Sequence, residues 1–205
     1  MQQSLKRIKG AVRLLSTAEK INNMALSHSI LATLVGRAKP LSGYDLAKEF
    51  NSSVGFFWKT THQQIYRELA RLEKEGMLTS EIVRQNDRPD KKIYSITDNG
   101  RSHLVEWIAE PSIPTPIKED MLVKMYVGFL VPKEMLIKEL QQLRDIHEER
   151  LRLYHEYEEK YFSDVKKMNM KGKYRYLNLR SGISFETGHI KWCNEAIDFL
   201  KTEIE

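Results

Sequence analysis

Cysteine is almost absent from this sequence, because Cys193 is the single thiol among 205 residues. One cysteine cannot form an intramolecular disulfide or supply the several thiolates of a typical zinc site, and its scarcity suits a reducing compartment. No apolar run approaches the roughly 18 residues of a membrane-spanning helix, and the N-terminus lacks the continuous apolar core of a secretory signal. The sequence therefore predicts a cytoplasmic protein with no membrane among its partners.

The common catalytic and nucleotide-binding motifs are also missing. The sequence contains no H-E-x-x-H, no G-x-S-x-G, no Walker A loop and no G-x-G-x-x-G loop. His189 and Cys193 could offer two metal ligands from one helix, but no further ligands are spaced to complete a tetrahedral site. Cys193 is more simply a small apolar side chain in a helix seam. We predict no enzymatic activity, no cofactor and no metal site.

Positive charge exceeds negative charge only slightly, giving a net charge of +5. Residues 1–23 contribute +4 of it, residues 24–110 contribute +1, and residues 111–205 are balanced. Bulk charge therefore does not identify a nucleic-acid binder, and the case must come from local arrangement.

Residues 1–23 form a basic extension with an apolar helical stripe of Leu5, Ile8, Val12 and Leu15. This pattern fits an arm that follows DNA, a helix packed on a dimer, or contact with an anionic surface. Translation from Met24 is a fourth interpretation, and the sequence does not choose among the four.

Proline is concentrated at one place, where three of the six prolines lie between Pro111 and Pro116. Such a run breaks any helix and leaves a stiff, extended connector. We therefore predict four segments: the extension (1–23), an N-terminal domain (24–110), a proline-rich linker (111–118) and an α-helical C-terminal domain (119–205).

The N-terminal domain shows three helical patterns followed by two strand patterns. The first helix carries Leu26, Ile30, Leu31 and Leu34 and ends at Pro40, and the second begins with Ser42 as its N-cap and ends at Ser52 to Gly55. The third follows the cap candidates Thr60 and Thr61, buries Ile65, Leu69 and Leu72, and ends at Gly76. Strands at 77–84 and 92–96 enclose a polar tip at 85–90. A further helix, capped near Thr97, is expected to turn Leu104, Trp107 and Ile108 toward the core.

This order predicts a mainly α protein: a winged helix-turn-helix of three helices plus a two-stranded β wing, followed by an all-α dimerisation domain. In such a fold the third helix enters the major groove of DNA, and its outward residues reach base edges and phosphates. A solvated helix face is the ordinary alternative. The wing tip holds Arg84, Arg88, Lys91 and Lys92 against two aspartates, enough for phosphate contacts without sequence reading. Residues of helix three predicted to contact DNA are Thr60, Thr61, His62, Gln63, Gln64 and Arg67.

The C-terminal domain shows three helical patterns and no strand pattern. We predict helices over Glu119–Leu130, Lys133–Phe162 and about Tyr174–Ile204. The two long helices each carry an apolar seam, and because segments this thin should not bury both seams within one chain, we infer a homodimer. Side chains assigned to dimerisation are Leu136, Leu140, Leu143, Ile183, Ile190, Trp192, Ile197 and Leu200.

Polar residues interrupt both seams near the middle of each helix. A carboxylate that is buried without a partner costs several kcal/mol, so Glu186 must be solvated, protonated or paired. We predict that Glu186 lies within salt-bridge reach of His147 or Arg150, from the same chain or a partner. A curved seam that leaves Glu186 in water is the alternative.

The runs SGYDLAKEF, FFWKTTHQQIYRELARLEKEGML and PDKKIYSITDNG resemble the PadR family of bacterial transcription regulators. The matching positions are Gly43-Tyr44-Asp45, Tyr66 to Leu69 and Tyr94 to Gly100, and the downstream His189 to Ile197 resembles the helical domain of the branch related to virulence-gene activators. The resemblance implies a homodimer on a palindromic operator in double-stranded DNA. It places Tyr66 near a phosphate and Arg88, Lys91 and Lys92 in the wing.

Two further functions are compatible with these patterns. The resemblance to the PadR family also allows a ligand-sensing repressor with a phenolic or planar aromatic effector in the C-terminal domain, where Trp192 would stack on the ligand. The chain could instead be an adaptor whose winged helix binds protein, since residues 24–110 are nearly neutral.

Overall fold

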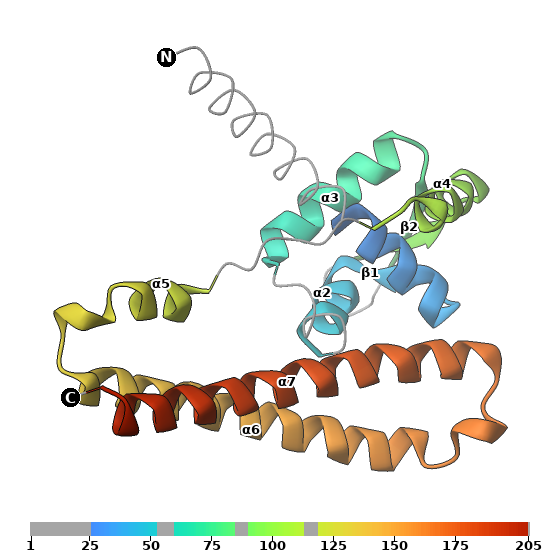
Figure 1. Cartoon of the computed structure of the whole chain (residues 1–205). Helices are drawn as coiled ribbons and strands as arrows, with labels where there is room; N and C mark the ends of the chain where they lie inside the picture. The colour runs from blue at the N-terminus through green and yellow to red at the C-terminus, as the bar shows by residue number, and fades with distance from the viewer. Residues whose placement is uncertain (1–25, 53–59, 85–89, 113–118, 205) are drawn as a thin grey trace. The chain divides into compact units, whose positions relative to one another are not determined.

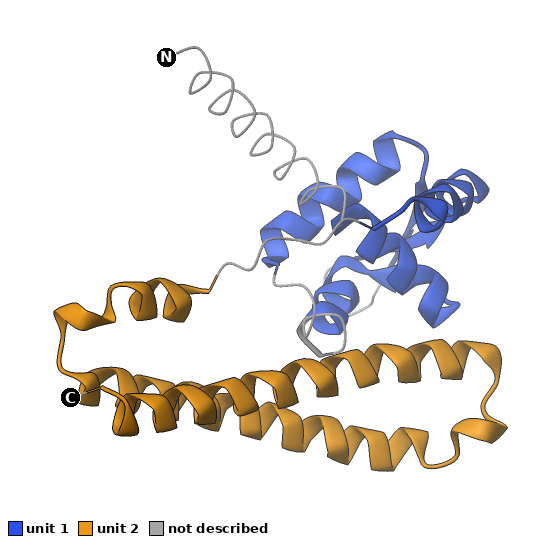
Figure 2. Cartoon of the chain, in the orientation of Figure 1, with its two compact units in different colours: residues 1–114 blue, residues 115–205 orange. Residues whose placement is uncertain are grey.

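The computed structural model describes residues 26–52, 60–84, 90–112 and 119–204. The chain divides into two compact units, residues 1–114 and 115–205, and the division falls within the proline-rich run (Figure 2). Each unit is described by itself.

The first unit contains the helices and the hairpin that the sequence predicts (Figure 1). Residues 26–37 are helical, and the elements that follow are β1 (Leu41–Ser42), α2 (Gly43–Ser52), α3 (His62–Lys74), β2 (Leu78–Val83), β3 (Lys91–Ile96) and α4 (Asp98–Ala109). The antiparallel sheet has the order β1-β3-β2. The third strand, β1, was not predicted, because two residues are too short to show a strand periodicity.

Local capping chemistry fixes where these helices begin and end. The Thr61 hydroxyl accepts from the Gln64 amide of α3, the Thr97 hydroxyl accepts from the Gly100 amide of α4, and the Ser42 hydroxyl accepts from the Asp45 amide of α2. After α3, Gly76 takes φ +71°, a left-handed conformation that favours glycine. These boundaries confirm the caps predicted from the sequence.

The predicted apolar positions form one core in the first unit. Ile30, Leu46, Ile65, Leu69 and Leu72 are all buried, and Phe50, Leu78 and Tyr94 join them. Leu104 of α4 also joins this core, but the prediction was wrong for its neighbours, since Trp107 is 40% and Ile108 67% exposed. The Trp107 ring instead stacks on the His28 ring at 4.3 Å.

A polar network ties α3 to the first helix. Glu68 is buried, and its carboxylate accepts hydrogen bonds from the Arg71 guanidinium at 2.6 and 3.1 Å and from the Ser27 hydroxyl. Burial acts to raise the pKa of Glu68, but the hydrogen bonds from Arg71 and Ser27 together with the Arg71 charge outweigh it and hold the pKa below its ordinary value.

Acid should therefore destabilise the first unit through Glu68. A carboxyl whose folded-state pKa is lowered stabilises the fold above its unfolded-state pKa, and this stabilisation is lost as pH falls through the folded-state value. We expect the free energy of unfolding to decrease once the pH drops below about 4.5, which is the ordinary pKa of a glutamate side chain. A Glu68→Gln variant should be less stable at neutral pH and lose less on acidification. Urea unfolding between pH 3 and pH 7 measures the stability of the wild type and the variant. An identical pH dependence of their free energies of unfolding would contradict the role assigned to Glu68.

The described residues of the second unit, 119–204, form helices and short turns and include no strand. It contains α5 (Asp120–Tyr126), the 3-10 turn η1 (Gly128–Leu130), α6 (Lys133–Phe162), η2 (Val165–Lys167) and α7 (Met170–Thr202). The bounds of α6 match the prediction. The single helix predicted for Glu119–Leu130 is wrong, because β-branched Val127 and then Gly128 are poor helix formers and the helix ends before them.

The start predicted for the last helix, Tyr174, is also wrong. The Asn169 side chain accepts a hydrogen bond from the Gly172 amide at 2.9 Å, so α7 begins at Met170. The apolar seam on which the prediction depended begins only later in the helix.

The two seams bury each other within one chain. Helices α6 and α7 lie side by side as a hairpin (Figure 1), and Leu136, Leu140, Cys193, Ile197 and Leu200 form its core. Leu143 and Trp192 are half-buried against this core, Ile183 is buried and Ile190 is half-buried. The premise that one chain cannot bury both seams is therefore wrong. Burial of Leu136, Leu140, Ile183, Ile197 and Leu200 needs no partner, whereas Leu143, Ile190 and Trp192 keep part of their surface exposed.

The polar interruption of the seams is a buried pair within the chain. The Glu186 carboxylate contacts His147 Nδ1, and the two side chains are only 4% and 7% exposed. The His147 ring stacks on the His189 ring at 4.7 Å, and His189 lies 3.4 Å from Glu119. The structure confirms the predicted pairing of Glu186 with His147, whereas Arg150 is exposed.

Candidate nucleic-acid interface

Helix α3 presents one buried face and one exposed polar face. The buried face, with Ile65, Leu69 and Leu72, packs against the core. The opposite face presents Gln63, Tyr66 and Arg67, which are all exposed. Tyr66 and Arg67 follow Gln63 by three and four residues, so the three side chains are neighbours on the helix surface. No described residue forms an ion pair with Arg67. A guanidinium, an amide and a phenol thus stand together on a rigid helix, which is the donor and acceptor chemistry that reads base edges and holds phosphates.

Three of the predicted DNA-binding residues, Thr60, Thr61 and Gln64, hydrogen-bond to one another at the N-terminus of α3. Gln64 Oε1 accepts from the Thr61 amide at 2.9 Å and from the Thr60 hydroxyl at 3.2 Å, while Thr61 caps the Gln64 amide. This capping box occupies the Gln64 side chain. Thr61 and His62 are exposed at the same end and Thr60 is half-exposed, where the helix dipole favours an anion.

Tyr66 is positioned by a glycine of α2. A Cβ on Gly43 would lie 2.4 Å from Tyr66 Cε1, so only glycine admits the ring at this distance. Tyr66 remains 47% exposed. The close approach of the Tyr66 ring thus explains why the Gly-Tyr-Asp motif has a glycine at position 43. The sequence pattern alone did not show this reason.

The wing lysines are tied to the body of the domain. Lys91 Nζ lies 2.8 Å from the Asp45 carboxylate of α2, and Lys92 Nζ lies 2.7 Å from the Glu73 carboxylate of α3. The hydrogen bond from Lys91 holds the pKa of Asp45 below its ordinary value, and that from Lys92 lowers the pKa of Glu73. Sequence reasoning did not find these pairs, because both acidic partners are distant in the sequence. Arg88 lies outside the described residues.

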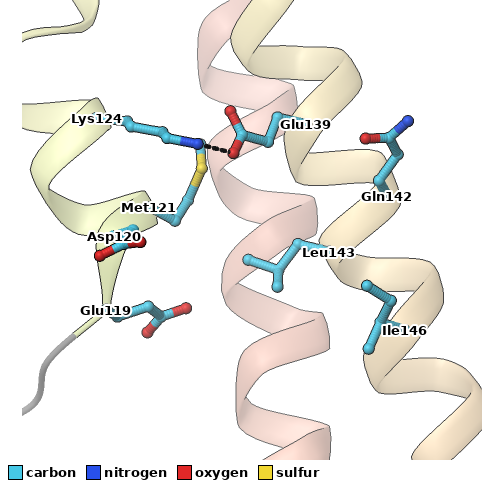
Figure 3. A pocket seen from close by; sticks show the side chains of 8 residues that line it. All are labelled: Glu119, Asp120, Met121, Lys124, Glu139, Gln142, Leu143 and Ile146. Atoms are coloured by element: carbon cyan, nitrogen blue, oxygen red, sulfur yellow. Dashed lines mark hydrogen bonds and ion pairs between the residues drawn. The ribbon is translucent and has the colours of Figure 1, made fainter.

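The second unit has an open groove between α5 and α6 (Figure 3). Its lining includes the carboxylates of Glu119, Asp120 and Glu139, and Lys124, its one basic residue, pairs with Glu139. Met121 and Leu143 supply apolar surface there. Trp192, proposed for ligand stacking, is half-buried against the core of the second unit. The described residues include no group of three or more His, Cys, Asp or Glu that could hold a metal ion.

Comparisons with known proteins identify the family. Residues 30–106 match the model of the transcriptional regulator PadR-like family, and residues 117–201 match the model described as virulence activator alpha C-term. The chain is 37% identical over 188 residues to the probable transcriptional regulator Rv1176c of Mycobacterium tuberculosis, covering 87% of this chain and 98% of that one. The chain belongs to the PadR-like family of transcriptional regulators. Its family and named relatives are regulators and not enzymes.

Solved structures support the same PadR-like fold. Bacillus subtilis PadR in complex with operator DNA has a TM-score of 0.75 at 26% identity, covering 86% of this chain and 99% of that one. The Vibrio cholerae virulence activator AphA has a TM-score of 0.70 at 29% identity, covering 87% and 99%. The Bacillus subtilis PadR has also been solved with p-coumaric acid, with a TM-score of 0.70 at 26% identity, covering 86% and 98%. Among the described residues of this PadR-like chain, no helix is long and apolar enough to cross a membrane.

Proposed function

We propose that this PadR-like regulator binds a palindromic operator in double-stranded DNA as a homodimer, with α3 in the major groove. The observation that carries the proposal is the exposed face of Gln63, Tyr66 and Arg67 on a helix whose other side is locked into the core. The likeness to Bacillus subtilis PadR in complex with operator DNA supports it.

The side chains on this face divide by chemistry. Gln63 pairs with adenine and Arg67 with guanine, since an amide and a guanidinium can each make two hydrogen bonds to those bases. His62 and the Tyr66 hydroxyl hold phosphates around the N-terminus of α3, and Thr60 and Thr61 order that end through their hydrogen bonds with Gln64. Gln64 acts in the helix cap. Lys91 and Lys92 set the position of the wing through their ion pairs, and Arg84 and Arg88 contact the DNA backbone.

The homodimer is supported by an exposed apolar segment and not by the seams. Between residues 122 and 135, eight large apolar side chains are exposed, among them Tyr126 at 85% and Phe129 at 84%. The others are Leu122, Val123, Val127, Leu130, Val131 and Met135. A concentration of this kind marks an interface, and a second copy of the chain is the partner that a palindromic operator requires.

An effector in the C-terminal domain is compatible with the complex of Bacillus subtilis PadR with p-coumaric acid. In this chain, however, the groove between α5 and α6 holds three carboxylates and one lysine that is already paired. Its charge disfavours a phenolic acid, whose own carboxylate would be repelled.

Replacing the two base-reading residues tests the function. Gln63→Ala and Arg67→Ala should each weaken operator binding by about 1–3 kcal/mol and relax base preference at one operator position. The measurement is a mobility shift with the duplex upstream of the chain's own gene and a shuffled duplex of equal composition, at two salt concentrations. Binding to both duplexes must weaken as salt rises.

The Gln64→Ala variant is the matched control. It should lower the stability of α3 and leave base preference unchanged, because its side chain caps the helix. Unchanged operator affinity in both the Gln63 and Arg67 variants means that α3 is not the reading helix. A wild-type protein that binds neither duplex favours the protein-binding adaptor.

A further inference from the structure

The tip of the α6–α7 hairpin is strongly basic. We define the basic tip as residues 160–175, which hold six Lys or Arg and a single acidic residue, Asp164. This net charge of +5 lies within a C-terminal half, residues 111–205, that is neutral as a whole. The remainder of that half therefore carries −5, and charge is separated along the hairpin.

Three lysines of the basic tip have no acidic partner in the described part of the chain. Asp164 pairs with Lys167 at 2.8 Å, whereas Lys166, Lys171 and Lys173 are exposed and form no ion pair with any described residue. On the exposed face of α6, by contrast, Arg152 is balanced by two carboxylates, those of Glu149 and Glu156. The basic tip departs from that pattern.

Helix stability does not explain these charges. Lys171 and Lys173 lie at the N-terminal end of α7, whose first turn has no acidic residue. The positive end of the helix dipole disfavours cations at this position. By contrast, Lys160 in the last turn of α6 is placed favourably. Lys171 and Lys173 therefore weaken the helix that carries them, which indicates that they bind an anion outside the chain.

Exposed phenols accompany the lysines. Tyr161 is 51% exposed and Tyr174 64% exposed, and their hydroxyls can donate to phosphate oxygens. Insertion into a lipid surface needs a continuous apolar face, and Met170 is the one large aliphatic side chain exposed among residues 160–175. Repeated phosphates reached by lysines and phenols are the chemistry of a nucleic-acid backbone.

We propose that the basic tip is a second DNA-binding surface, in which Lys166, Lys171 and Lys173 contact backbone phosphates without reading sequence. The proposal rests on the proposed function, because α3 and the wing bring the chain to DNA. It adds a sequence-independent contact from the C-terminal domain to the sequence-reading contact of the winged helix.

The test replaces the three lysines together in the full chain, as Lys166→Gln, Lys171→Gln and Lys173→Gln. The matched control is Lys138→Gln, Lys191→Gln and Lys201→Gln, which removes the same charge from exposed positions elsewhere on α6 and α7. Fluorescence anisotropy with a labelled mixed-sequence duplex gives the affinity over a series of KCl concentrations. Each lost phosphate contact lowers the slope of log K against log salt by about 0.9.

The tip variant should show a slope smaller by about 2.7 per protomer and affinity at low salt reduced at least tenfold, while the control stays close to the wild type. An equal loss in both variants assigns the effect to net charge and overturns the proposal. So does an unchanged slope in the tip variant, in which case operator reading by Gln63 and Arg67 still stands. A tip variant that keeps DNA binding but loses binding to phosphatidylserine vesicles assigns the surface to membranes instead. A wild type that binds no DNA contradicts both this proposal and the proposed function.

Discussion

Replacing Glu186 by alanine should lower the free energy of unfolding of the C-terminal unit by about 3 kcal/mol. The Glu186 carboxylate and His147 Nδ1 are paired inside the hairpin and almost fully enclosed. Removal of the carboxylate leaves a buried imidazole nitrogen without its partner and opens a cavity among packed side chains. Urea unfolding followed by circular dichroism measures the loss.

A double-mutant cycle separates the pair from the cavity. Glu186→Ala combined with His147→Ala should cost at least about 1 kcal/mol less than the sum of the two single changes. Arg150→Ala is the control, because this exposed side chain is not the partner of Glu186 and its loss should fall within about 0.5 kcal/mol of the wild type. Strictly additive single changes would show that the pair contributes nothing of its own.

Replacing Tyr126 and Phe129 together by serine should convert the proposed homodimer into a monomer. Aromatic side chains at the centre of an interface typically cost 2 kcal/mol or more each when truncated, so the dimer dissociation constant should rise roughly 1,000-fold for the pair. Both side chains are more than four-fifths exposed in the single chain, so the substitutions should leave the fold of the protomer intact. Sedimentation velocity over a range of concentrations follows the change.

The control for this experiment is Tyr157→Ser, an exposed aromatic of α6 that lies outside the apolar segment of residues 122–135. It should dimerise like the wild type. A double variant that still sediments as a dimer would place the interface elsewhere on the chain. Operator binding by the monomer should weaken as well, because two linked half-sites bind far more tightly than one.

Most of the local structure could be predicted from the amino-acid sequence, apart from β1 and the bounds of α5 and α7. Caps and periodicity predicted the helices of the winged-helix unit, the hairpin and the bounds of α6, because hydrogen bonds within three or four residues decide such boundaries. The motifs around Gly43, Tyr66 and Tyr94 also sufficed to identify the PadR-like family. The pairing of Glu186 could be predicted because a carboxylate in an apolar seam must be solvated, protonated or paired to avoid a large desolvation cost.

Contacts between distant segments became visible only in the folded chain. It showed that α6 and α7 bury their seams against each other, that Gln64 is used by its own helix, and that Lys91 and Lys92 pair with Asp45 and Glu73. It also showed that Ile108, which was expected in the core, is exposed to solvent. An apolar stripe or a charged side chain indicates only that it needs a partner. Which residue is that partner depends on contacts between segments far apart in the chain, and hydrophobic periodicity and motif spacing do not encode those contacts.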